Sequence, residues 1–121
     1  MLDDDVLHFL RSDIASVWTL DLLVLLHREA PRFRDMETLT RELRASPGII
    51  ATALAQLKGA GVVEERSNAY RYYPVYKELE LLVDKLAASY AKYPMAVTQA
   101  ILTAPNLKIR LFADAFRIKR R

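Results

Sequence analysis

The sequence predicts a mainly α-helical fold with a small β-hairpin. Apolar residues recur at helical spacing along most of the chain. A stretch between residues 62 and 75 is instead rich in β-forming residues on both sides of a short polar link. With 121 residues, 52% of them apolar, the chain can bury one core but not two. We therefore expect a single small domain built mostly from helices.

The first part of the chain predicts two helices. A short one should contain Val6, Phe9 and Leu10, with three aspartates in its first turn, where negative charge is favourable. Ser12 or Asp13 can cap a second helix that runs to about Arg28 and ends before the Ala30-Pro31 pair. The apolar residues that this second helix should bury are Ile14, Val17, Trp18, Leu22, Leu25 and Leu26.

A further helix is expected from Met36 to Ala45. Asp35 can accept hydrogen bonds from the free N–H groups at the start of this helix. Met36, Leu39 and Leu43 repeat at near-helical spacing and should face the core. The opposite face carries charged residues.

Another helix should follow after a tight turn, over residues 47 to 60. Ser46 is a good cap, and Pro47 suits the first helical position because its missing N–H would have had no partner there. Gly59 and Gly61 offer the left-handed backbone that commonly ends a helix. The residues of its buried stripe, spaced i, i+3, i+4 and i+7, are Ile50, Ala53, Leu54 and Leu57.

The hairpin is expected from residues 62 to 66 and 70 to 75, because Asn68 in the link between them tolerates a positive φ. After the hairpin a helix with a near-heptad apolar stripe should run as far as Pro94, which must break or kink it. Two more helices are expected, from Met95 to Leu102 and over residues 107 to 118.

The segment from Ser46 to Val63 resembles the recognition helix and first wing strand of winged helix-turn-helix transcriptional regulators of the MarR and PadR type. It has a Ser-Pro opening, two core aliphatics, a Leu-x-x-Leu spacing and an Ala-Gly-Val-Val ending. The resemblance covers about Val17 to Tyr73. It implies a winged helix-turn-helix domain with an N-terminal helix over residues 1–75 and a C-terminal helical extension over residues 76–121.

The resemblance also implies a bacterial-type regulator that inserts helix 47–60 into the major groove of double-stranded DNA, with the wing on phosphate or minor groove. Helical extensions of this kind commonly form a homodimer, and two-fold symmetry would double the DNA contacts of a small DNA-binding domain. The candidate dimer interface is Leu79, Leu82, Val83, Leu86 and Tyr90. The alternative is that these helices fold back on their own domain.

The helix 47–60 exposes few groups that can read bases. Gln56 could contact an adenine edge, Thr52 could form one hydrogen bond, and Ile49 or Ala51 could meet thymine methyl groups. Backbone affinity would come from arginines and lysines around this helix and on the wing. The full candidate DNA-binding set is Arg41, Arg44, Pro47, Gly48, Ile49, Thr52, Gln56, Lys58, Arg66, Asn68 and Arg71.

Glutamates weaken the basic character of this surface, because Glu37, Glu42, Glu64 and Glu65 lie among the cations. The sequence therefore leaves open a second hypothesis, that the apolar face of helix 47–60 binds protein. The chain would then be a winged-helix adaptor or antagonist of another regulator.

Catalysis, metal binding and a cofactor are not expected. The chain has no cysteine, and its two histidines fall on separate predicted helices without metal-ligand spacing. Its longest apolar run, Leu22 to Leu26, is too short to span a bilayer, and Asp3 to Asp5 occupy the place where a signal peptide carries positive charge. We expect a cytoplasmic protein.

The net charge of +3 is unevenly distributed. Residues 104 to 121 contain six Lys and Arg against one Asp, which gives +5 there and −2 over the rest of the chain. This basic tail could contact nucleic acid or an acidic partner, or it could be a solvated helix end.

Overall fold

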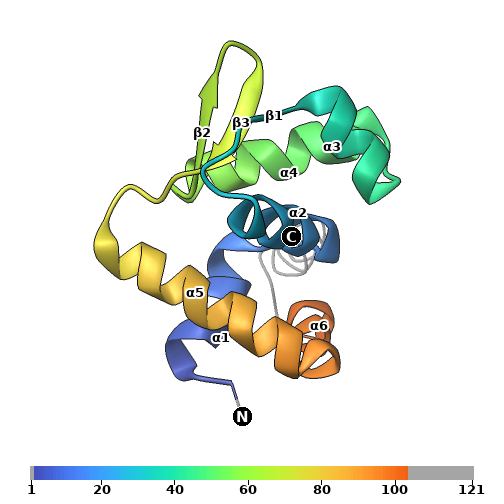
Figure 1. The fold of residues 1–121 in the computed structure, drawn as a ribbon. Helices are drawn as coiled ribbons and strands as arrows, with labels where there is room; N and C mark the ends of the chain where they lie inside the picture. The colour runs from blue at the N-terminus through green and yellow to red at the C-terminus, as the bar shows by residue number, and fades with distance from the viewer. Residues whose placement is uncertain (1, 104–121) are drawn as a thin grey trace, which may run out of the picture.

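The computed structural model describes residues 2–103. The elements in chain order are α1 (Asp4–Asp13), α2 (Val17–Arg28), β1 (Arg34–Asp35), α3 (Met36–Leu43), α4 (Pro47–Gly59), β2 (Val63–Arg66), β3 (Ala69–Tyr72), α5 (Lys77–Lys92) and α6 (Pro94–Thr103) (Figure 1). The predicted class, mainly helical with a little antiparallel sheet, is confirmed. The predicted helix over residues 107 to 118 and the basic tail lie outside the described residues.

The helices form two groups that share one core. In Figure 1, α1, α5 and α6 pack on one another below, while α2, α3, α4 and the sheet form the upper part. A continuous apolar cluster extends through both groups, from Ile101 on α6 to Leu54 on α4. Two polar contacts also join them, since the Tyr90 hydroxyl donates to Asp21 Oδ1 at 2.7 Å and His27 Nε2 lies 2.8 Å from Asp84 Oδ1.

Short polar side chains fix where the helices begin. Asp35 accepts from the Thr38 N–H at 2.7 Å and Ser46 from the Ile49 N–H at 3.3 Å, which confirms both predicted caps. The predicted cap of the second helix was wrong. Ser16, rather than Ser12 or Asp13, caps α2, because those two residues still belong to the end of α1.

The hairpin is part of a three-stranded antiparallel sheet in the order β1-β3-β2. Val63 pairs with Tyr72, and Arg34 of the added strand pairs with Tyr70. Ser67 and Asn68 both have positive φ, 52° and 63°, as a tight two-residue hairpin turn requires. The second hairpin strand ends at Tyr72, earlier than predicted, two residues before Pro74, which has no N–H to donate.

The stripe predicted as a dimer interface lies largely in the chain's own core. Leu79, Val83 and Leu86 on α5 are 5%, 1% and 0% exposed, and α5 packs against α1 and α6. Leu82 and Tyr90 are half-buried against the same core. The structure thus shows the alternative arrangement, in which the C-terminal helices fold back on the domain. Homodimerisation itself stays a prediction, and these three leucine and valine side chains are not available on the surface to mediate it.

The packing of α5 can be tested by truncation. Leu86→Ala should lower the free energy of unfolding by about 2–5 kcal/mol, because it leaves a cavity in a fully buried site. Leu81→Ala on the same helix is the matched control; Leu81 is 52% exposed, and its loss should fall within about 0.5 kcal/mol. Urea unfolding followed by circular dichroism measures both. Equal losses for the two variants would contradict the observed orientation of α5.

Candidate nucleic-acid interface

One face of α4 is open to solvent and the other is buried. Ile50, Ala53, Leu54 and Leu57 are at most 2% exposed, as predicted for the core stripe of this helix. The exposed residues of α4 between positions 47 and 55 are Pro47, Gly48, Ile49, Ala51, Thr52 and Ala55. This face bears no charged side chain before Lys58, so any reading of bases would depend on shape, methyl contacts and the Thr52 hydroxyl.

Gln56 makes a contact within the fold that the sequence did not predict. The Thr19 hydroxyl of α2 donates to Gln56 Oε1 at 2.7 Å, and Thr19 is itself 1% exposed. Gln56 therefore belongs to the contact between α2 and α4, and reading an adenine would require this hydrogen bond to break. Periodicity could not reveal the contact, because it joins residues 37 positions apart in the sequence.

Three predicted phosphate-binding cations are bonded to carboxylates. Glu64 accepts from Arg71 Nε at 2.7 Å and from Arg66 Nη2 at 3.0 Å, and Glu65 accepts from Lys58 Nζ at 2.6 Å. These hydrogen bonds hold the pKa values of Glu64 and Glu65 below their usual range, while Glu65 raises the pKa of Lys58. Both carboxylates are therefore ionised at neutral pH, and they offset much of the positive potential of the wing.

The two wing arginines differ in how freely they can move. The Arg71 guanidinium makes cation–π contacts with the rings of Phe33 and Tyr73, with its Cζ 4.8 and 4.6 Å from their centroids. Its side chain is only 19% exposed, whereas that of Arg66 is 64% exposed. Arg66, together with exposed Asn68 at the turn, is the wing group best placed to reach a ligand.

Arg41 and Arg44, at the end of α3, carry the least compensated charge of the candidate set. Arg41 Nη1 lies 3.7 Å from Glu37 Oε1, and because both side chains are strongly exposed this ion pair is weak. Arg44 is exposed and forms no ion pair with any carboxylate in the described part of the chain. Its backbone is left-handed, with φ 55° and ψ 41°, at the C-cap of α3. An arginine in this conformation costs free energy that a glycine would not.

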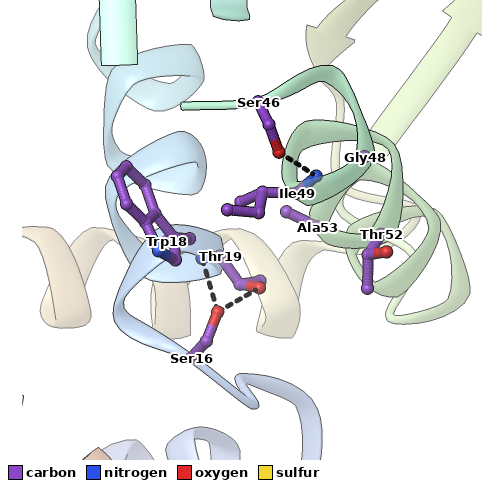
Figure 2. A pocket seen from close by; sticks show the side chains of 8 residues that line it. All are labelled: Ser16, Trp18, Thr19, Ser46, Gly48, Ile49, Thr52 and Ala53. Carbon is purple, nitrogen blue, oxygen red and sulfur yellow. Dashed lines mark hydrogen bonds between the residues drawn. The ribbon is translucent and has the colours of Figure 1, made fainter. Parts of the chain in front are cut away.

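A groove of about 440 Å³ separates the first turns of α2 and α4. Figure 2 shows Trp18 on α2 facing Ile49 on α4 across it. These side chains are 38% and 37% exposed, so the prediction that Trp18 is buried was wrong. The other lining residues are Ser16, Thr19, Ser46, Gly48, Thr52 and Ala53, none of them charged. We call this the Trp18–Ile49 groove.

Residues 2–103 contain no cluster of three or more His, Cys, Asp or Glu side chains that could hold a metal ion. His8 Nε2 lies 3.4 Å from the Ser12 hydroxyl, and His27 contacts Asp84 and forms a T-shaped ring pair with Tyr72. Within the same range, no helix has the length and apolar character needed to cross a bilayer.

Comparison with protein-family models, with curated proteins and with solved structures gave no match.

The backbone strain at Arg44 predicts a stabilising substitution. Arg44→Gly should raise the free energy of unfolding by about 0.5–1 kcal/mol, because glycine adopts a positive φ without a Cβ clash, an effect partly offset by its greater freedom in the unfolded chain. Arg44→Ala removes the same charge but keeps the Cβ, so it should give no such gain. Thermal unfolding of both variants checks the difference, and equal stability would contradict the strained conformation.

Proposed function

We propose that this chain is a DNA-binding transcriptional regulator of the winged helix-turn-helix type, and that it docks α4 on duplex DNA. The proposal is supported by the order of elements α2, β1, α3, α4, β2, β3 and by the sheet order β1-β3-β2. This order sets a helix with an open face beside a β-hairpin (Figure 1). Such a helix can enter a major groove while the hairpin meets the neighbouring backbone.

The single observation on which the proposal chiefly depends is the surroundings of the first turn of α4. Arg41 and Arg44 lie immediately before it, with little or no carboxylate compensation. Gly48 is exposed and has nothing within 4 Å of the position of a Cβ, so a phosphate could approach the backbone closely there. The N-terminus of a helix also favours negative charge. The first turn is thus the part of α4 at which binding of an anionic ligand is most favourable.

The proposal implies that phosphate contacts dominate affinity and that base reading is sparse. Ile49, Ala51 and Thr52 remain exposed for contact with bases, whereas Gln56 is held by Thr19. We also propose that the chain acts as a cytoplasmic homodimer, since a second copy would compensate for the few base contacts that one copy makes. Its interface would use surface other than the buried stripe of α5.

Phosphate binding by Arg44 has a distinct salt signature. Arg44→Gln should weaken binding to every duplex sequence and lower the slope of log affinity against log salt by about one, because one fewer counterion is released. Arg11→Gln removes the same charge from the exposed end of α1, in the other group of helices, and should leave the slope unchanged. Fluorescence anisotropy of a labelled duplex measures both. Absence of duplex binding by the unmodified chain at low salt would overturn the proposal.

A second candidate function is a protein-binding adaptor, and the Trp18–Ile49 groove is the observation that favours it. A large aromatic ring and a branched aliphatic side chain, both more than one-third exposed, face one uncharged groove. Aromatic anchors of this kind concentrate binding energy in protein interfaces. In this function α4 would contact protein in place of DNA.

Ile49→Arg separates the two functions. On the adaptor function, a guanidinium forced into an apolar contact should abolish capture of a specific partner. On the DNA function it adds a possible phosphate or guanine contact, so general duplex affinity should hold or rise. Leu81→Arg on α5 is the control for an added surface charge. A partner retained by the Leu81→Arg chain but lost by the Ile49→Arg chain, with no duplex binding by either, would favour the adaptor.

A further inference from the structure

We infer that a groove between α3 and the first turn of α4 binds an acidic peptide. Both the carboxylates and the apolar side chains of the peptide would contact the groove. The groove has a volume of about 640 Å³. We call it the Arg41–Arg44 groove; its lining residues are Met36, Glu37, Thr40, Arg41, Arg44, Ala45 and Pro47. It shares no lining residue with the Trp18–Ile49 groove.

Apolar groups supply much of the lining. Met36 and Ala45 are partly buried against the hydrophobic core, and Pro47 is exposed beside them. The Thr40 hydroxyl donates to the Met36 carbonyl at 2.7 Å, so its donor is already used within α3. A pocket of this size can enclose a few side chains and is ordinarily lined in just this way, by apolar groups with a small number of polar ones.

The charged part of the lining selects an anion. It contains two guanidinium groups and a single carboxylate, that of Glu37, which gives a net charge of +1. The Glu37 side chain is 89% exposed and lies 3.7 Å from Arg41, so it can rotate away from the groove at a small cost in free energy. Arginine binds carboxylates in a planar, bidentate geometry, which makes these two groups well suited to Asp or Glu side chains. Charge complementarity therefore favours an acidic occupant.

A peptide fits this combination better than a nucleic-acid backbone does. A phosphodiester strand could satisfy the arginines, but its charged backbone would leave Met36, Ala45 and Pro47 without apolar contact. A segment that carries Asp or Glu next to Leu, Met or Phe would satisfy both parts of the groove. Arg44 is also a proposed phosphate contact, so an acidic peptide and DNA would compete for it. The peptide site itself does not depend on DNA binding.

Selection from a display library of short random peptides, performed without DNA, tests the inference. The enriched sequences should combine acidic and apolar residues. Their binding should shift the methyl NMR signal of Met36 in protein labelled at the methionine methyl groups. The signal of Met95, which is 76% exposed on α6, should stay in place. The Arg41→Gln, Arg44→Gln double variant should bind about tenfold or more weakly, the loss expected from two charge-assisted contacts.

Three results would overturn the inference: no enrichment of acidic peptides, enriched peptides that bind the double variant as tightly as the unmodified chain, or a shift of Met95 without one of Met36. Arg11→Gln is the control for overall charge and should change peptide affinity by less than about twofold. Because binding is read at Met36 in the absence of DNA, failure here leaves the duplex experiment unaffected, and failure there leaves this site standing.

Discussion

The packing of α4 against α2 determines which surface the molecule can offer. Ile50, Leu54 and Leu57 are buried to 2% exposure or less, and the facing helix α2 supplies equally buried leucines. This apolar contact removes one face of α4 from water and leaves the other face, from Pro47 to Ala55, exposed. The hydrogen bond from Thr19 to Gln56 fixes the rotation of α4 at the same contact. If this packing changed, neither the exposed face nor the Trp18–Ile49 groove beside it would survive.

Charge pairing is the second constraint on function. The sheet and α4 contain several cations, but Glu64 and Glu65 bind those of the wing and of the end of α4. Arg34 is buried in ion pairs with Glu29 and Glu42 and stabilises the link between α2 and α3. Within the candidate DNA-binding set, the positive charge that no carboxylate compensates is therefore concentrated at the end of α3. Both the proposed DNA contact and the proposed peptide site depend on this one concentration of charge.

Local signals predicted much of the fold. Asp35 and Ser46 cap helices through their own side chains, Pro94 begins a new helix, and the stripe of α4 has strict helical spacing, so each could be read from neighbouring residues. Strand β1 was missed because two residues are too few to show an alternating pattern. The stripe of α5 was ambiguous because a core helix and a dimer seam have the same apolar period. Only the packing of α1 and α6 on α5 distinguishes them.

The candidate site was less predictable, because its properties come from contacts between distant residues. No local pattern shows that Thr19 holds Gln56, that Glu64 binds two arginines, or that Trp18 faces Ile49. The positive φ of Arg44 was also not predicted, since arginine is not a residue that usually ends a helix in this way.

Genome-wide footprinting of the tagged chain in cells tests DNA docking by α4 most directly. Discrete protected sites that share a symmetric motif are the predicted result; a footprint no different from that of an untagged control would contradict it.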